Sequence, residues 1–556
     1  MRIQLVRYHD VDNINTRLAK SLNQRQGALP PLGLAYIAAV LEQAGHEIDV
    51  IDAVAEGLAK NDVRDRIRKF KPRMVGITSM TPTFRGAQEC AQIAKAEGAI
   101  TVVGGVHMAI FARETLSYDY IDYGVVGEGE ETIVELCDAI ENSKSVAGIK
   151  GLAYKSDGQV IVGPERIVDD LDALPFPAFH LLPMKRYSSI IGLHPVTTMM
   201  GSRGCPYKCS FCYKTPSDKQ YRRRSPANIV DEMVYLQSTY GVKEIMFYDD
   251  LMPPKYAREL CEEILSRNVK IAWETPQRVN LVDPELLQLM QKAGCRLLRY
   301  GVEQGDPQQM QLIEKRITVD QVKKVFRWTK EAGIDTFAYF IIGYAFETDE
   351  TMRATIDLAK ELNPRFVMFT KATPLPKTPL MGMALEQGLI TEDYWSDFTL
   401  GKRTHPIPPF VPNARSWVER AYREFYLRPR KILEQISHIR SYQDLKKNIS
   451  GFIGLLLFKM SDDDILEVVS TTTDIDGQMV EVERELHLTK GVDGAMPVAR
   501  WIEKNKEYGK DVAIPEWASL AHDRGLVGAA ADDSSRITLP VLSNVLPEVK
   551  EDGAAE

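Results

Sequence analysis

The sequence predicts an α/β protein in which a doubly wound parallel sheet is followed by an open, partial barrel and a helical extension. Two observations support this fold class. Short apolar strands alternate with helices over the first 380 residues, and a proline-rich segment interrupts the alternation once. The chain has 556 residues, 44% hydrophobic and 26% charged, as expected for a globular protein of several domains. Its net charge of −8 disfavours a nucleic-acid binder, which is normally basic.

Residues 1–145 form the first predicted domain. Strands are expected at 3–7, 47–51, 74–79, 100–103 and 120–126, with helices at 31–44, 63–70, 86–96 and 130–142. This order predicts a flavodoxin-like parallel sheet covered by helices on both faces. Ligands of such sheets bind at the carboxyl ends of the strands, so functional residues are expected there.

Residues 146–195 differ in character and are interpreted as a linker with a small hairpin. Two short apolar runs flank Asp157-Gly158, a dipeptide typical of a tight hairpin turn. The stretch Leu174-Pro175-Phe176-Pro177 then favours a stiff, extended chain, because neither a helix nor a central strand accommodates its prolines.

Residues 196–380 again alternate and form the second predicted domain. Strands are expected at 196–201, 243–248, 270–274, 297–302, 336–342 and 365–370, with helices at 227–239, 255–266, 283–293, 319–332 and 349–361. Six strand–helix units are too few for a closed eight-fold barrel, so a partial (β/α)6 barrel of the TIM type is predicted.

The C-terminal part is less informative. Residues 381–460 are expected to be helical, and residues 461–556 form an uncharacterised extension with a disordered end from 548. The apolar stretch Ile449–Phe458 is about half as long as a membrane-spanning helix. It is interpreted as a buried or interfacial helix, with membrane-surface contact as the alternative.

The start of the chain and its cysteines predict a cytoplasmic protein. The N-terminus lacks the long apolar run of a signal peptide. Seven cysteines, three of them within eight positions, do not form the even framework of a secreted disulfide protein. They indicate a reducing compartment and a metal site.

The strongest chemical signal is Cys205-x3-Cys209-x2-Cys212, directly after the first strand of the second domain. Four thiolates would saturate a zinc ion or a four-iron cluster, whereas three leave one iron of a [4Fe–4S] cluster open to another ligand. A structural zinc site is the alternative, but the sequence places no fourth Cys or His close by.

With Phe211 before its last cysteine, the motif resembles the defining loop of the radical S-adenosylmethionine (radical SAM) superfamily. The resemblance implies that the open iron binds the amino and carboxylate groups of SAM, whose reductive cleavage gives a 5′-deoxyadenosyl radical. It extends to residues at later strand ends. The expected SAM contacts are Phe211 of the loop itself and Tyr248, Asp249, Arg278, Glu303, Ile341 and Gly343.

The roles of these residues follow from the same resemblance. Asp249 is expected at the SAM amino group, Arg278 at the carboxylate and Glu303 at the ribose. Ile341 and Gly343 belong to the strand on the adenine side. The usual Gly-Gly-Glu of the superfamily is absent, and the Asp249-Asp250 pair that stands there is similar to the cobalamin-dependent branch.

Residues 1–145 resemble the B12-binding domain of that branch. The expected cobalamin contacts follow the strands and are Ser79, Thr81, Gly104, Gly105, Val106, Gly127, Glu128 and Gly129. Methyl-carrying cobalamin domains use Asp-x-His-x-x-Gly, but the matching stretch Asp52–Gly57 has Val54 at the His position. No lower histidine ligand is therefore expected. His107 is interpreted as a loop histidine, with a ring-facing role as the alternative.

These resemblances imply a cobalamin-dependent radical SAM enzyme with a [4Fe–4S] cluster. The leading hypothesis is methylation of an unactivated carbon of a small-molecule, lipid or tetrapyrrole substrate, with a flavodoxin or ferredoxin as electron donor. The alternative is an oxidative cyclase, because 415–430 resembles the C-terminal helix of the anaerobic magnesium-protoporphyrin ester cyclase. A tRNA methylthiotransferase would need a second cysteine set before the barrel. A metal-stabilised binding protein without enzymatic activity is the last hypothesis.

Overall fold

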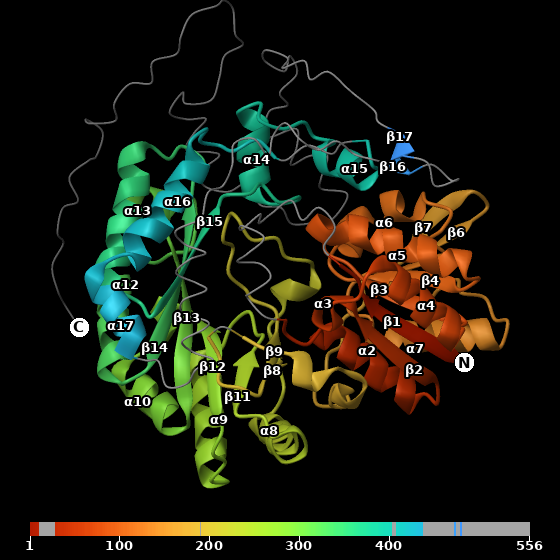
Figure 1. The fold of residues 1–556 in the computed structure, drawn as a ribbon, viewed down its shortest axis with the longest axis horizontal. Helices are drawn as coiled ribbons and strands as arrows, with labels where there is room; N and C mark the ends of the chain where they lie inside the picture. The colour runs from red at the N-terminus through yellow and green to blue at the C-terminus, as the bar shows by residue number, and fades with distance from the viewer. Residues whose placement is uncertain (10–27, 190, 403–406, 438–471, 474–478, 481–556) are drawn as a thin grey trace, which may run out of the picture. The chain divides into compact units, whose positions relative to one another are not determined.

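The structure is a computed structural model that describes residues 1–9, 28–189, 191–402, 407–437, 472–473 and 479–480. All of these residues belong to one compact unit, Met1–Val512. Within it the two sheets anticipated from the sequence are both present (Figure 1). The apolar stretch 449–458 lies outside the described residues, as does the tail after 480.

The first sheet has five parallel strands in the order β2-β1-β3-β4-β5. They are β1 (Arg2–Arg7), β2 (Glu47–Asp52), β3 (Met74–Thr78), β4 (Ile100–Gly104) and β5 (Tyr123–Val125). This is the flavodoxin-like order, and it confirms the predicted fold class. The order reverses between β1 and β3, so the crevice beyond the carboxyl ends of these strands is the natural ligand position.

Helices cover both faces of this sheet (Figure 1). They are α2 (Leu32–Gln43), α3 (Ala53–Glu56), α4 (Lys60–Phe70), α5 (Phe84–Ala96), α6 (Met108–Leu116) and α7 (Glu130–Glu141), with a 3-10 turn η1 (Thr81–Thr83) before α5. The helix α6 was not predicted, although its buried residues recur at the spacing of an amphipathic helix. In the structure Phe111 interrupts the helical backbone of α6.

The hairpin expected around Asp157-Gly158 is present as β6 (Leu152–Ser156) and β7 (Gln159–Val162). It extends the first sheet, because β6 pairs with β5 in the antiparallel sense. The chain then runs through the 3-10 turns η2 (Phe179–Leu181) and η3 (Met184–Arg186) to the second sheet.

The second sheet is a half-barrel of six parallel strands in the order β15-β14-β13-β12-β11-β8. The strands are β8 (Val196–Met199), β11 (Glu244–Phe247), β12 (Ala272–Gln277), β13 (Cys295–Glu303), β14 (Asp335–Ile342) and β15 (Phe366–Lys371). All six predicted strands are confirmed. A small antiparallel ribbon of β9 (Ser202–Arg203) and β10 (Arg222–Arg223) follows β8, with the 3-10 turn η4 (Ser217–Lys219) between its strands.

The connecting helices lie on the outer side of the half-barrel (Figure 1). They are α8 (Pro226–Tyr240), α9 (Pro254–Ser266), α10 (Pro284–Lys292), α11 (Pro307–Leu312), α12 (Val319–Glu331) and α13 (Asp349–Leu362), with the 3-10 turn η5 (Val279–Leu281) before α10. Side chains on the outer face pack on these helices. Tyr300, for example, contacts Phe326 and Thr329 of α12.

Beyond the half-barrel the described chain is helical, as predicted. It forms α14 (Pro379–Glu386), α15 (Tyr394–Thr399), α16 (Ala414–Tyr426) and α17 (Pro429–Ser437), and the two-residue strands β16 (Thr472–Thr473) and β17 (Met479–Val480) pair further on. Trp417, Ala421 and Phe425 form a buried apolar stripe on α16. Among the described residues, no helix is long and apolar enough to cross a membrane.

Candidate functional site

The cysteine loop begins directly after β9 and is fixed by its own backbone. Gly204 has a φ of +88°, and a Cβ there would lie 2.1 Å from the carbonyl oxygen of Gln220, so only glycine fits. The next amide, that of Cys205, donates to the Asp218 carbonyl at 2.7 Å. The Cys212 amide donates to the Cys209 carbonyl at 3.0 Å, which closes the loop.

The three cysteines of this loop are free. Cys205 and Cys209 are half-buried and Cys212 is exposed. The surrounding protein raises the pKa of the Cys212 thiol to about 12, and Cys209 and Cys205 are near enough to add to the rise, whereas Lys214 opposes it. Lys214 also donates to the carbonyls of Cys205 and Tyr207, both at 2.6 Å.

The donor atoms of this loop are three cysteine sulfurs, the usual ligands of an iron–sulfur cluster. Within the described part of the chain, no three His, Cys, Asp or Glu side chains are arranged to hold a single ion. A four-iron cube binds each thiolate through a different iron and therefore suits ligands that do not converge on one point. Thiolates are soft ligands that bind the iron of iron–sulfur clusters. The residues of this loop therefore fit a [4Fe–4S] cluster.

Arg278, beyond the end of β12, reaches the cysteine loop from a different strand. Its Nη1 lies 3.7 Å from the Cys209 sulfur, and its guanidinium lies 3.6 Å from the centre of the Tyr207 ring. Nη2 donates to the Lys315 carbonyl. The structure therefore brings the predicted carboxylate-binding arginine to the predicted cluster loop, although 69 residues separate Arg278 from Cys209.

The residues after β11 divide between the interior and the surface. Asp249 is buried, and its carboxylate accepts hydrogen bonds from the Gly201 amide at 2.7 Å and the Ser202 hydroxyl at 2.8 Å. Burial raises its pKa to about 6, against the effect of these hydrogen bonds. Tyr248 is 64% exposed. Asp249 thus anchors the chain after β8, and its expected contact with the SAM amino group stays a prediction.

Asp250 is a residue that the sequence interpretation did not select. Its side chain is exposed, and its charge contributes to the raised pKa of Cys212, which places the carboxylate near that thiol. The signal in the sequence was the doubled aspartate itself. Which of the two faces the loop depends on the turn after β11 and has no local signature.

Glu303 at the end of β13 forms a buried ion pair with Lys315. The pair lies over Gly301, where an added Cβ would be 2.2 Å from both partners. Only one oxygen of Glu303, Oε1, is engaged in this ion pair. Its predicted contact with a ribose stays a prediction.

The adenine-side strand ends in tight packing. Ile341 is buried, and Gly343 has a φ of +74°. A Cβ on Gly343 would lie 2.4 Å from the Cβ of Ala414, so the glycine allows α16 to approach. Glu347 accepts a hydrogen bond from the Tyr344 amide at 2.7 Å, and burial raises its pKa to about 7.

At the carboxyl edge of the first sheet, Gly105 brings two loops together. It has a φ of +96°, and a Cβ there would lie 2.4 Å from the Ser79 carbonyl oxygen. The neighbouring apolar side chains are exposed, Met80 by 57% and Val106 by 39%. An accessible apolar surface beside glycine backbone, with Gly104 half-buried next to it, fits a large planar ligand such as a corrin ring.

His107 is a core residue. Its ring stacks on Phe84 at a centroid distance of 4.0 Å, and its Nδ1 lies 3.2 Å from the Thr81 hydroxyl. Burial lowers its pKa to about 3, so the ring is neutral. Thr81, expected near cobalamin, is itself buried by this contact.

The loop after β5 contacts the β9–β10 ribbon of the second domain. Glu128 receives two hydrogen bonds from Arg222, both at 2.7 Å, and forms an ion pair with Arg203 at 3.2 Å. Gly127 is packed against the chain at Arg166, where a Cβ would lie 2.7 Å from the carbonyl oxygen. Gly129 is packed beside Val125, because an added Cβ would lie 3.2 Å from the Val125 side chain. This loop thus connects the first sheet to the β9–β10 ribbon, and its contacts with cobalamin stay predictions.

Linker residues contact the segment that has Val54 at the histidine position. The Asp52 carboxylate is buried, caps α3 by accepting from the Ala55 amide and accepts from the Tyr187 hydroxyl at 2.9 Å. Arg186 donates to the Glu56 carbonyl at 2.7 Å. Asp52 therefore supports the local fold where, in Asp-x-His-x-x-Gly domains, a metal-ligating histidine would follow.

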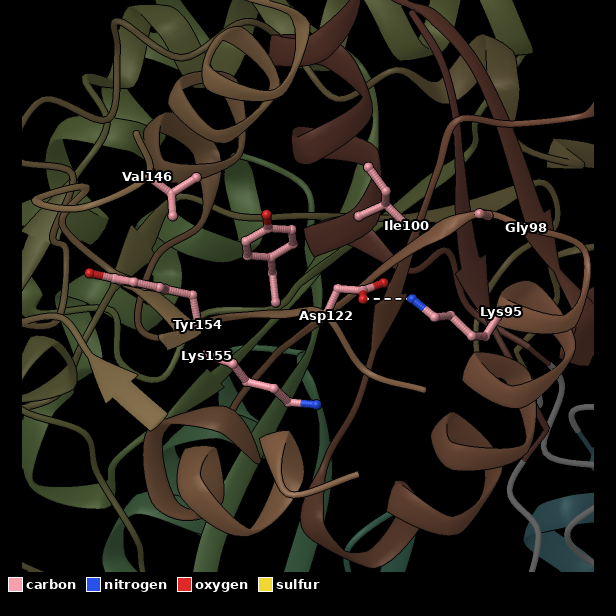
Figure 2. Close-up of a pocket in the computed structure, with 9 residues that line it drawn as sticks. Lys95, Gly98, Ile100, Asp122, Val146, Tyr154 and Lys155 are labelled. Carbon is pink, nitrogen blue, oxygen red and sulfur yellow. Dashed lines mark hydrogen bonds and ion pairs between the residues drawn. The ribbon is translucent and has the colours of Figure 1, made fainter. Parts of the chain in front are cut away.

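A pocket of about 360 Å³ opens at the opposite edge of the first sheet (Figure 2). It is lined by residues such as Ile100 and Tyr123, at the beginnings of β4 and β5, and by the Lys95–Asp122 ion pair. Because ligands of doubly wound sheets bind at the carboxyl ends, this pocket is not the expected cofactor position.

A flavodoxin-like sheet joined to a half-barrel with three free thiols on its first loop defines a class of enzymes that combine SAM cleavage with cobalamin. Residues 21–137 match the family model of the B12 binding domain, and residues 199–359 match that of the radical SAM superfamily. An uncharacterized methyltransferase from Pyrococcus horikoshii is 34% identical over 76% of this chain and 93% of its own length.

Two further comparisons extend this result. The anaerobic magnesium-protoporphyrin IX monomethyl ester cyclase of Cereibacter sphaeroides is 31% identical over 72% of this chain and 68% of its own length. The solved structure of the radical SAM methyltransferase TsrM from Kitasatospora setae, with cobalamin and a [4Fe–4S] cluster bound, has a TM-score of 0.58 at 22% identity. It covers 70% of this chain and 79% of TsrM and shows a shared fold.

The chain therefore belongs to the cobalamin-dependent radical SAM family, whose members include methyltransferases and the anaerobic cyclase. Its cofactors are cobalamin, SAM and a [4Fe–4S] cluster.

Proposed function

We propose that this chain methylates an unactivated carbon of a small-molecule substrate, with Cys205, Cys209 and Cys212 as the cluster ligands. The observation that carries the proposal is the contact of Arg278 with the sulfur of Cys209 and the ring of Tyr207. It joins two expected parts of one SAM site that are distant in the sequence. When bound, the cluster supplies the electron that cleaves SAM, and cobalamin carries the methyl group.

The residues of this chain position SAM and protect the site. Lys214 holds two carbonyls of the cysteine loop and so fixes its shape. The guanidinium of Arg278 suits a carboxylate, and the exposed carboxylate of Asp250 suits the ammonium group. Glu303 has Oε2 available to accept from ribose hydroxyls while Oε1 stays paired with Lys315.

We assign the cobalamin contacts to the loops after β3 and β4, where Ser79, Gly104, Gly105 and Val106 lie at the carboxyl edge. The exposed apolar side chains of Met80 and Val106 support this assignment. Val54 implies that no histidine from that loop ligates cobalt from below. A flavodoxin or ferredoxin in the cytoplasm is the proposed electron donor, in keeping with thiols that must stay reduced.

The methylation proposal has one supported alternative, an oxidative ring closure of the cyclase type. The 31% identity to the cyclase of Cereibacter sphaeroides favours it. Methylation is preferred because the methyltransferase relative matches over 93% of its length, against 68% for that cyclase.

Product analysis tests the proposal. The chain is purified without oxygen, its cluster is rebuilt, and SAM, cobalamin and a strong reductant are added. We expect S-adenosylhomocysteine together with 5′-deoxyadenosine. Cys209→Ala should lower the formation of 5′-deoxyadenosine by at least about 100-fold and reduce bound iron.

The matched control is Cys261→Ala, which removes a buried thiol on α9 that makes no part of the proposed site. It should keep iron and both products. Deoxyadenosine alone would favour the cyclase, and iron-loaded protein that forms neither product would refute both functions.

A further inference from the structure

The chain that follows the cysteine motif folds back and contacts the first cysteine. Residues 215–220, termed the support turn, make this contact. The Cys205 amide donates to the Asp218 carbonyl at 2.7 Å, and an added Cβ on Gly204 would lie 2.9 Å from the same oxygen. The backbone at the first cysteine is therefore shaped by the position of the support turn.

Side chains within the support turn keep it closed. The Thr215 amide donates to the Asp218 carboxylate at 3.0 Å, and the Asp218 amide donates to the Thr215 hydroxyl oxygen at 3.2 Å. The hydroxyls of Thr215 and Ser217 lie 2.6 Å apart, and both residues are buried. Reciprocal bonds of this kind fix the backbone of a short segment, so a displacement of Ser217 also displaces Asp218.

Glu165 of the linker binds the support turn from outside. Its half-buried carboxylate accepts from the Ser217 hydroxyl at 2.9 Å and from the Ser217 amide at 3.2 Å. The hydroxyl bonds to Oε1 and the amide to Oε2. Because the carboxylate accepts two bonds from one residue, it fixes both the position and the orientation of Ser217.

The first domain in turn fixes Glu165. The linker pairs with the loop after β5 through a bridge between Gly127 and Arg166, and the Glu128 amide donates to the Arg166 carbonyl at 3.1 Å. An added Cβ on Gly127 would lie 2.4 Å from Cγ of Glu165, so this side chain packs directly on the glycine. Arg166 is buried and pairs with Glu135 of α7 at 2.8 Å. The linker backbone beside Glu165 is therefore anchored to the first domain.

The ion pairs of Glu128 act at other points of the cysteine loop. They bind Arg203 before the motif and Arg222 after the support turn, both on the β9–β10 ribbon. These pairs hold the two ends of the segment, whereas Glu165 contacts the part between them that bonds to Cys205. Loss of the Glu165 carboxylate should therefore change the shape of the loop without detaching it from the first domain.

We propose that Glu165 is a positioning residue for the cluster loop. It holds Ser217, the support turn places the Asp218 carbonyl, and this carbonyl orients the backbone of Cys205. The hydrogen bonds of Glu165 are to the support turn rather than to the thiols, so it acts on the cluster through the backbone. This inference rests on the proposed function, because it concerns the loop assigned there to the [4Fe–4S] cluster.

Iron retention by the anaerobically rebuilt protein tests the inference. The full chain is mixed with the ferrous-iron chelator ferrozine, and iron loss is followed by absorbance. Glu165→Ala should lose iron about tenfold faster than the wild-type chain, the effect of about one lost charge-assisted hydrogen bond. The g values of the reduced cluster in electron paramagnetic resonance should also change, because Cys205 is oriented differently.

The matched control is Asp169→Asn, which changes an exposed acidic residue of the same linker. This variant should keep the wild-type rate of iron loss and the wild-type spectrum. If Glu165→Ala matches the control in both measurements, the inference is wrong.

A double-variant comparison shows whether the effect passes through Ser217. Ser217→Ala removes the hydroxyl donor and keeps the amide, so iron loss should rise about threefold. The double variant should lose iron no faster than Glu165→Ala alone, since both changes remove the same contact. Additive effects would overturn the inference. Ser217→Ala also tests the contact if Glu165→Ala does not fold, and wild-type behaviour of Ser217→Ala would contradict the proposed role.

The products of SAM are measured in the same preparations. If the wild-type chain forms S-adenosylhomocysteine and 5′-deoxyadenosine while Glu165→Ala keeps its iron and spectrum, the positioning role is refuted and the proposed function stands. If Glu165→Ala loses iron rapidly but the wild-type chain forms neither product, the positioning role stands and the proposed function is refuted.

Discussion

The predicted site residues lie in different surroundings at the carboxyl edges of the two sheets. At the half-barrel, side chains from separate strands meet the cysteine loop, as Arg278 does at Cys209. At the first sheet, Glu128 pairs with Arg222, and Gly105 packs on Ser79. A cluster held by thiolates needs particular side chains, whereas a large ring bound by shape and backbone needs space. The sequence therefore marks the first kind of site more clearly than the second.

The largest expected effect tests the half-barrel side of this comparison, at Arg278. Arg278→Leu removes a buried guanidinium from the sulfur of Cys209 and from the Tyr207 ring. A charge-assisted contact contributes about 1.5–3 kcal/mol, so kcat/KM for SAM should fall about 10- to 100-fold. Steady-state formation of 5′-deoxyadenosine measures it. Arg267→Leu, at the end of α9, is the control, and equal kinetics for both variants would contradict the SAM-binding role.

A second, smaller effect concerns the first sheet and its acid stability. The pKa of His107 is about 3 in the folded chain, because of burial, against 6.5 when exposed. As the pH falls below 6.5 the unfolded chain takes up a proton that the folded chain does not, so stability is lost down to about pH 3. At pH 5 the loss amounts to about 2 kcal/mol.

His107→Phe keeps an aromatic ring beside Phe84 and removes the titrating group. Thermal unfolding at pH 7 and pH 5 should therefore show a smaller loss of Tm in the variant than in the wild type. If Tm falls by the same amount in both proteins, His107 takes up its proton in the folded chain as well. That outcome would contradict its buried, neutral state.

The smallest effect sharpens the contrast between the two edges of the first sheet. Lys95→Ala breaks the ion pair with Asp122 beside the pocket of Figure 2, where Lys95 is 42% exposed. An exposed pair of this kind contributes at most about 1 kcal/mol. Cobalamin binding, followed by absorbance titration, should not change. Weaker cobalamin binding by this variant would contradict the assignment of cobalamin to the carboxyl edge of the first sheet.

The fold was predictable because its dominant patterns are local. Parallel strands buried on both faces appear as short apolar runs, and all six strands of the half-barrel were recognised from them. The helix α6 was missed, and its partner, the core of Trp395 and Phe398 in α15, lies far along the chain. Hydrophobic spacing alone contains no information on such long-range packing.

The candidate site shows the same division. The three thiols are neighbours in the sequence, so their proximity follows from the loop. The burial of Asp249 depends on donors at Gly201 and Ser202, 48 and 47 residues earlier. No local pattern distinguishes it from the exposed Asp250, and the assignment of Asp249 to SAM rested on the resemblance alone.

The ion pairs between the first domain and the β9–β10 ribbon restrain the segment that leads into the cysteine loop. Arg203 immediately precedes Gly204 and Cys205, and it pairs with both Glu128 and Glu130 at the start of α7. The segment that leads into the thiols is thus bound to the loop that ends β5. If either segment moves, the other must move with it, or these largely buried ion pairs must break. In the proposed function, this electrostatic link holds the segment that leads into the cluster loop close to the loop after β5.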